Sequence, residues 1–196
     1  HSESMEALYA HTPGLKMVIP SSPYEAKGLL ASAIRDPDPV IFYEPKRLYR
    51  ALKEEVPEKE YLIPLGKARI VREGSDLTLI SWGSMLYTAL QTVEQLKDKY
   101  SIEVIDVSTI SPLDFETILA SVAKTGRCVI VHEAPRSFGA GAEIAAQIAE
   151  KALLSLQAPV QRVTGFDTVF PLYKLENIYL PDVKRVSAAI EEVMKF

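Results

Sequence analysis

His132 and Glu133 are adjacent side chains of the types that can transfer a proton. An imidazole beside a carboxylate can exchange a proton near neutral pH. The pair ends the β-rich run 128–132, however, and neighbouring residues on a strand point to opposite faces. We therefore predict a hydrogen-bonded structural role for the pair rather than an acid–base couple. His11 is predicted to lie in a turn or an interface.

Two short glycine-containing turns precede predicted helices, at residues 82–84 and 139–141. Neither turn matches the G-x-G-x-x-G pattern of dinucleotide sites, and neither carries a P-loop lysine. We predict a tight turn at the first, with Ser84 as the helix cap, and a close approach of helix and strand at the second. The single cysteine, Cys128, is predicted to be a buried apolar residue, since one cysteine cannot form an intrachain disulfide.

The composition is that of a soluble globular protein. The 196 residues are 47% hydrophobic and 24% charged, with a net charge of -4 and a pI near 5.5. Acidic and basic residues are interspersed, so no broad cationic surface is expected for nucleic acid. No apolar run approaches the roughly 18 residues of a membrane span. We expect a cytoplasmic protein that binds neither nucleic acid nor membrane.

Strands and helices are expected to alternate after residue 67. The β-rich runs cover residues 68–71, 77–81, 102–107, 128–132 and 160–164. Apolar residues at helical spacing separate the last four runs, and a final helix is predicted over residues 183–195. This alternation predicts an α/β domain with a mostly parallel sheet that helices cover on both faces.

Ligands of such a sheet usually meet the loops at the carboxyl ends of its strands. Four loops are expected at this edge, at residues 82–84, 108–110, 133–135 and 165–167. Their residue types alone identify no self-contained active site.

Residues 1–45 are expected to form only part of a domain. An apolar strand over residues 14–20 precedes a helix in which Ser22 caps the amide of Glu25 while Glu25 reaches back. A strand over residues 40–43 follows, but no earlier strands complete this unit. We therefore expect a longer polypeptide and a partner protein. Residues 46–66 are charged and proline-containing and are predicted to be a linker, with a short helix over residues 47–54.

Several stretches resemble the beta subunit of the thiamine-diphosphate-dependent 2-oxo acid dehydrogenases, the decarboxylating component of the pyruvate and branched-chain 2-oxo acid complexes. The matching stretches are HSES, AHTPGLKMVIPSSPYEAKGLL, AIRDPDPVIFYEPKRLYR, IEVIDVSTISPLD, TGRCVIVHEAP and APVQRVTGFDTVFP. The resemblance covers the whole chain. It implies that residues 1–45 are the tail of a thiamine pyrimidine-binding domain, residues 46–66 an interdomain linker and residues 67–196 a transketolase carboxyl-terminal domain.

The resemblance implies an enzyme that oxidatively decarboxylates a 2-oxo acid and transfers the acyl group to lipoyllysine. His1 matches the histidine that opens the HSQS-like motif of the family and faces the thiazolium, so it is expected to be catalytic. Thiamine diphosphate and magnesium are expected to be held mainly by an alpha subunit and by residues that precede His1. The chain alone is therefore expected to be inactive. The resemblance does not identify which 2-oxo acid is the substrate.

The resemblance also implies a potassium ion, held by the backbone carbonyls of Ala33 and Ile34 and by Asp36 and Asp38. Oxygen ligands suit such a hard cation. The implied partners are an alpha subunit, a second beta subunit in an alpha2-beta2 heterotetramer, and the lipoyl acyltransferase core. The alternative is a non-catalytic assembly module for beta–beta dimerisation and acyltransferase docking.

Overall fold

The structure is a computed structural model that describes residues 2–196, so His1 lies outside the described residues. The elements, in chain order, are α1 (Glu6–Ala10), β1 (Lys16–Val18), α2 (Pro23–Arg35), β2 (Val40–Phe42), the 3-10 helix η1 (Lys46–Leu48), β3 (Arg69–Arg72), β4 (Leu77–Ser81), α3 (Ser84–Leu96), β5 (Ile102–Asp106), β6 (Thr109–Ser111), α4 (Phe115–Thr125), β7 (Cys128–Pro135), α5 (Ala140–Ala152), the 3-10 helix η2 (Leu153–Ser155), β8 (Gln161–Gly165), α6 (Glu176–Tyr179) and α7 (Val183–Val193).

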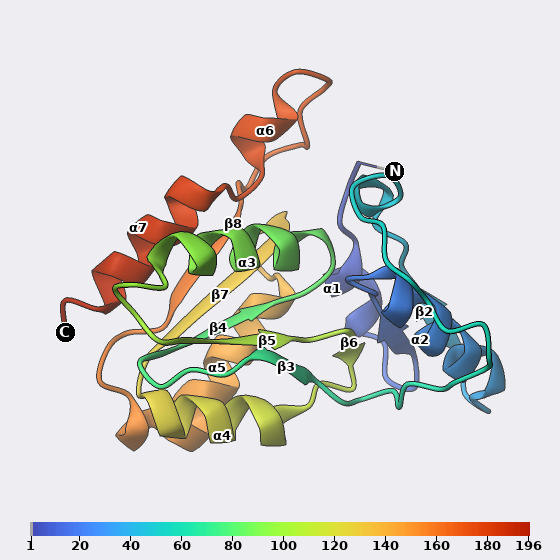
Figure 1. Ribbon diagram of the computed structural model, residues 1–196, viewed down its shortest axis with the longest axis horizontal. Helices are drawn as coiled ribbons and strands as arrows, with labels where there is room; N and C mark the ends of the chain where they lie inside the picture. Colours follow the sequence, from blue (N-terminus) through green and yellow to red (C-terminus); the bar gives the residue numbers. More distant parts are fainter. Residues whose placement is uncertain (1) are drawn as a thin grey trace.

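A five-stranded sheet with the order β3-β5-β4-β7-β8 organises the carboxyl-terminal part of the chain (Figure 1). Strands β4, β5, β7 and β8 pair in parallel, and β3 lies antiparallel to β5 at one edge. The prediction of a mostly parallel sheet in an α/β domain is therefore confirmed.

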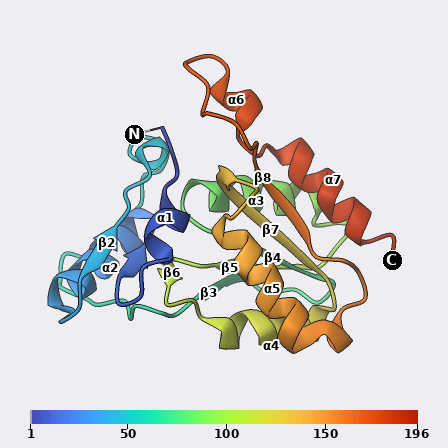
Figure 2. The ribbon, with the colours of Figure 1, turned by 180° about the vertical axis from the view of Figure 1, so that it is seen from behind.

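Helices cover both faces of this sheet, and each face has its own apolar core (Figure 2). On one face, Ile118 of α4 and Ile144 of α5 pack against the sheet in a cluster that includes the buried Cys128. On the other face, Val93 of α3 and Ile190 of α7 pack against the opposite side chains of the same strands. The alternation of buried side chains on both faces explains why the central strands are almost continuously apolar.

A second, three-stranded sheet has the order β2-β1-β6. Strand β1 pairs in parallel with β2 and antiparallel with β6, so residues distant in sequence complete the first sheet. The prediction of a simple loop at residues 108–110 is wrong, because Thr109 and Ile110 belong to β6. The free edge of β1 provides the backbone partners that draw this segment into a strand.

The start of α2 confirms the predicted cap. Ser22 Oγ accepts a hydrogen bond from the Glu25 amide at 3.3 Å. The Glu25 carboxylate reaches back and accepts from the Ser21 amide at 2.9 Å. The prediction of Ser84 as a helix cap is wrong, because Gly83 occupies the cap position of α3 with φ 55°, a conformation that favours glycine.

Several short elements also differ from the sequence prediction. Instead of a helix over residues 47–54, the chain forms only the single turn η1. Strand β7 continues to Pro135, so the predicted loop 133–135 forms the end of a strand. Helices α1 and α6 were not predicted, since five and four residues are too few to show an apolar period. Within residues 2–196, no helix has the length and apolar character needed to cross a membrane.

Candidate functional site

A pocket of about 400 Å³ lies where the first residues of the chain meet the carboxyl ends of β4 and β7. Among the residues that line it are Ser4, Glu6, Trp82, Ser84 and Glu133. Two of the four predicted edge loops, at residues 82–84 and 133–135, thus border one pocket. The pocket lies at the edge of the sheet where parallel α/β folds commonly bind ligands.

Glu6 is the most deeply buried acid of this pocket, with 2% of its surface exposed. The indole Nε1 of Trp82 donates to Glu6 Oε1 at 3.4 Å. Burial, and to a lesser degree the nearby charge of Glu133, raises the pKa of Glu6 to about 6. A carboxyl group of this kind can exchange a proton near neutral pH. Sequence reasoning missed Glu6, because a single acid in a five-residue helix carries no distinguishing pattern.

Glu133 connects the beginning of the chain to the turn before α3. Ser4 Oγ donates to Glu133 Oε1 at 2.7 Å, and Ser84 Oγ donates to Glu133 Oε2 at 2.6 Å. Both carboxylate oxygens therefore hold a hydroxyl donor, one from each side of the pocket. Ser84 was expected to cap a helix, but its hydroxyl fixes this acid instead.

His132 has a packing role and does not act with Glu133. Its ring is fully buried and stacks on Trp82, with ring centroids 5.2 Å apart and an interplanar angle of 11°. Neither ring nitrogen has a hydrogen-bond partner among residues 2–196. The predicted hydrogen-bonded role is therefore confirmed for Glu133 and wrong for His132. Burial, followed by the charge of Arg162, lowers the pKa of His132 to about 4. The imidazole is therefore neutral at pH 7.

The glycines of the 139–141 turn leave room for this imidazole. A Cβ atom at Gly141 would lie 2.6 Å from His132 Nε2, and one at Gly139 would lie 2.9 Å from His132 Cε1. Both distances are shorter than a van der Waals contact, so a Cβ atom at either position would overlap the imidazole. The prediction of a close approach between helix and strand is confirmed.

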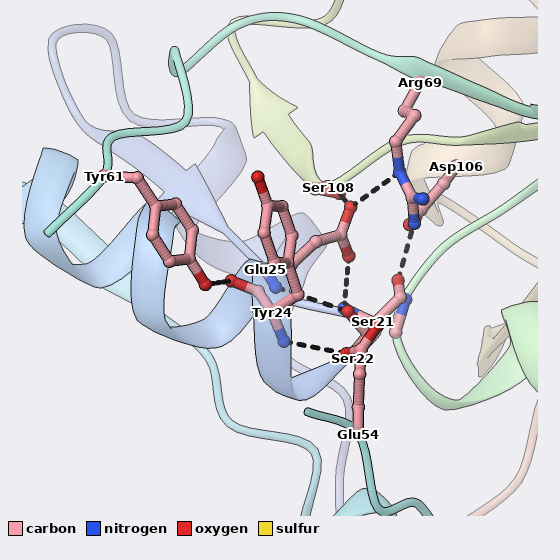
Figure 3. Close-up of polar contacts among 10 residues, drawn as sticks. Ser21, Ser22, Tyr24, Glu25, Glu54, Tyr61, Arg69, Asp106 and Ser108 are labelled. Atoms are coloured by element: carbon pink, nitrogen blue, oxygen red, sulfur yellow. Dashed lines mark hydrogen bonds and ion pairs between the residues drawn. The ribbon is translucent and has the colours of Figure 1, made fainter. Parts of the chain in front are cut away.

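A second polar cluster joins α2 to the five-stranded sheet (Figure 3). The Glu25 carboxylate accepts from Ser108 Oγ at 3.0 Å and from Arg69 Nε at 3.2 Å. The Asp106 carboxylate accepts from Ser21 Oγ at 2.8 Å, and Arg69 also reaches it at 3.4 Å. Two buried acids thus share one half-exposed arginine.

The charge of Asp106 is unfavourable in this cluster. Burial raises the pKa of Asp106 well above its usual range, and the neighbouring charge of Glu25 raises it further. The hydrogen bond from Ser21 and the charge of Arg69 oppose this effect only in part. Asp106 therefore retains its proton to a higher pH than an exposed aspartate does.

The residues predicted to bind potassium lie at the end of α2. Asp36 Oδ1 and Asp38 Oδ2 lie 2.7 Å and 3.0 Å from the ammonium of Lys16. The carbonyl of Ala33 accepts a hydrogen bond from the Asp36 amide at 3.3 Å. The structure thus brings both acids to one cationic group, which is a lysine of the same chain. Ile34, in the last turn of α2, is 77% exposed.

The described side chains do not fit a magnesium–diphosphate site. Within residues 2–196, no group of three or more His, Cys, Asp or Glu side chains is arranged to hold a metal ion. We therefore assign no reaction step to contacts between these side chains and such a group.

The family "Transketolase, C-terminal domain" matches residues 66–186, and "Transketolase, pyrimidine binding domain" matches residues 1–51. The pyruvate dehydrogenase E1 component subunits beta of Staphylococcus epidermidis and Bacillus subtilis are 50% and 51% identical over 100% of the chain. The chain spans only 61% of the length of each of these relatives.

Two solved structures share the fold. A split gene transketolase, described as an inactive beta4 tetramer, gives a TM-score of 0.81 at 25% identity and covers 98% of this chain and 62% of its own. A transketolase from Leishmania mexicana gives 0.62 at 18% identity, over 97% of this chain and 27% of its own, and supports the fold alone. The chain therefore belongs to the transketolase C-terminal domain family and is a homologue of pyruvate dehydrogenase E1 beta subunits.

Proposed function

We propose that the chain is the carboxyl-terminal portion of the beta subunit of a thiamine-diphosphate-dependent 2-oxo acid dehydrogenase. The complete enzyme would oxidatively decarboxylate a 2-oxo acid and transfer the acyl group to lipoyllysine. The observation that carries this proposal is the identity of about 50% to pyruvate dehydrogenase E1 beta subunits over the whole chain. For the same reason we propose pyruvate as the 2-oxo acid.

The proposed division of labour follows the enzymes that the chain resembles. His1 would act at the reacting centre during acyl transfer. Thiamine diphosphate and magnesium would be held mainly by the alpha subunit and by beta-subunit residues before His1. Residues 1–45 would be the tail of the pyrimidine-binding domain, residues 46–66 the linker and residues 67–196 the carboxyl-terminal domain.

The proposed partners are an alpha subunit, a second beta subunit and the lipoyl acyltransferase core. An exposed apolar segment supports contact with other proteins. After β8 the chain runs out from the body of the molecule to α6 (Figure 1), and Val169, Leu172 and Tyr173 are each more than 80% exposed there. Apolar side chains that gather at the surface mark interaction sites. The same segment favours the second candidate function, a non-catalytic assembly module.

Reconstitution separates the two candidate functions. The full-length beta subunit, mixed with its alpha subunit, thiamine diphosphate and magnesium, is expected to form an alpha2-beta2 particle that acylates free lipoyl domains with pyruvate. The rate with 3-methyl-2-oxobutanoate is expected to be lower, and the present chain with the alpha subunit is expected to be inactive. A stable particle of full-length subunits that turns over neither oxo acid would contradict the enzyme and support the assembly module.

We also propose a potassium site formed by the carbonyls of Ala33 and Ile34 with Asp36 and Asp38. Because the ammonium of Lys16 binds both acids, potassium would have to displace it. We expect Lys16→Met to raise the stabilisation by potassium by roughly 1 kcal/mol when the ion is at about ten times its dissociation constant. Thermal unfolding in potassium chloride and in choline chloride measures this effect. Equal midpoints in the two salts for both proteins would contradict the site.

A further inference from the structure

The residues directly after His1 lie across the carboxyl-terminal edge of the five-stranded sheet. We call residues 2–6 the His1 segment. Its side chains make three hydrogen bonds with the sheet edge. Glu3 Oε1 accepts from the Phe170 amide at 3.3 Å, and Ser4 Oγ donates to Glu133 at 2.7 Å. Glu6 Oε1 accepts from Trp82 Nε1 at 3.4 Å. The partners follow or end three different parallel strands, β8, β7 and β4. The edge that usually binds ligands here binds residues 3, 4 and 6 of the same chain.

Glu133 provides the shortest of these contacts, at 2.7 Å. The second oxygen of Glu133 holds the hydroxyl of Ser84, which is 4% exposed and begins α3 directly after the Gly83 turn. Glu133 is thereby fixed from the sheet side before it meets Ser4.

The contact between Trp82 and Glu6 is also rigid. Trp82, which meets Glu6, is 3% exposed and has the neutral ring of His132 stacked against it. The two glycines at 139 and 141 let α5 approach this imidazole closely, because a Cβ atom at Gly141 would overlap it. The sheet edge therefore presents a preformed surface to the His1 segment.

We propose that Glu133 is a positioning residue that acts through Ser4 to hold His1 at the reacting centre. This inference rests on the proposed function, because the role of His1 comes from it. Ser4 lies three residues from His1, a stretch of chain that spans at most about 10 Å. A shift of Ser4 is therefore transmitted to His1, and a misplacement of about 1 Å at a reacting centre can cost about 10²-fold in rate.

The test uses the full-length beta subunit assembled with its alpha subunit and compares Glu133→Ala with Glu133→Gln. Alanine removes both hydroxyl contacts. Glutamine retains them, because its amide can accept from one serine and donate to the other, whose hydroxyl also accepts. Glu143→Ala is the matched control, since Glu143 is exposed on α5 and bonds only Gln147 among the described side chains.

Two readouts are measured for each variant, namely hydrogen exchange of the backbone amides in residues 2–6 and the kcat and KM of lipoyl acylation. For Glu133→Ala we expect backbone exchange in the His1 segment to be about tenfold faster, which corresponds to the loss of one hydrogen bond. We expect kcat to fall about tenfold or more while the KM for pyruvate stays within about twofold. Glu133→Gln and Glu143→Ala are expected to behave like the unsubstituted enzyme.

The outcomes distinguish failure of this inference from failure of the proposed function. Unchanged exchange in residues 2–6 of Glu133→Ala would overturn the positioning role. A Ser4→Ala variant provides a second check, because its effect and that of Glu133→Ala should not add if both act through one contact. Additive losses would also overturn the inference. Faster exchange with unchanged acylation would instead contradict the role of His1 in the proposed function.

Discussion

Acyl transfer to lipoyllysine is expected to fall about 10²- to 10⁴-fold when His1 is replaced by alanine in the full-length beta subunit assembled with its alpha subunit. This is the usual contribution of a positioned general acid or base. His1 is proposed to donate or accept a proton as the acyl group is transferred, and alanine removes that proton carrier. Decarboxylation of pyruvate, measured with an artificial electron acceptor, is expected to fall much less.

The chain contains a matched control for this experiment. His11 is an exposed histidine just after α1 and does not line the pocket. His11→Ala is therefore expected to leave both rates unchanged. Equal rates of lipoyl acylation for the His1→Ala and unsubstituted enzymes would remove His1 from the mechanism, whatever the behaviour of His11→Ala.

The second large effect is expected on stability, from Asp106→Asn. Folding raises the pKa of Asp106 above the 3.8 of an exposed aspartate, mainly through burial and then through the charge of Glu25. Between these two pKa values the folded chain holds a proton that the unfolded chain has lost. The stability of the unsubstituted chain therefore falls as pH rises above about 4, by about 1.4 kcal/mol for each unit of the increase in pKa.

Asparagine resembles the protonated acid, because it cannot ionise and still accepts from Ser21. We expect Asp106→Asn to be close to the unsubstituted chain in stability near pH 4 and to become progressively more stable than it as pH rises toward the raised pKa of Asp106. Urea unfolding at several pH values measures the difference. If the difference in free energy of unfolding between the two proteins stays constant or decreases as pH rises, the charge of Asp106 does not destabilise the fold.

Asp114→Asn is the matched control, for which the opposite dependence of stability on pH is expected. Asp114 is also buried, and burial raises its pKa, but hydrogen bonds from the Ala68 amide and from Thr117 outweigh burial and lower the pKa overall. Its charge therefore stabilises the fold above the unfolded pKa. Asp114→Asn should become less stable than the unsubstituted chain as pH rises.

The fold could be predicted from sequence where each element carries its own pattern. The helix at Ser22 begins with a cap that only nearby residues determine, and the central strands are apolar because helices cover both faces. Strand β6 had no such signal, since its three residues become a strand only through the edge of β1. Local patterns specify local structure, whereas long-range pairing depends on the assembled fold.

The candidate site shows the same difference. His132 and Glu133 were correctly predicted to lie on a strand and not to act as a couple, but they lie inside β7 rather than at its end, because the strand continues to Pro135. The partners of Glu133 could not be predicted, because Ser4 and Ser84 lie 129 and 49 positions away. Likewise, no spacing rule brings Lys16 to Asp36 and Asp38. Contacts of this kind depend on tertiary packing.

Strand β6 also limits how this polypeptide can be dissected or grafted. The predicted linker at residues 46–66 would be the obvious place to separate two modules, yet β6 lies beyond it in sequence and pairs with β1, which precedes it. A fragment that begins at residue 67 would contain β6 without its partner β1. The backbone amide and carbonyl groups of β6 that pair with β1 would then have no hydrogen-bond partners in that strand. Such edges invite unwanted association with other chains, so any recombinant fusion should retain β1 together with β6.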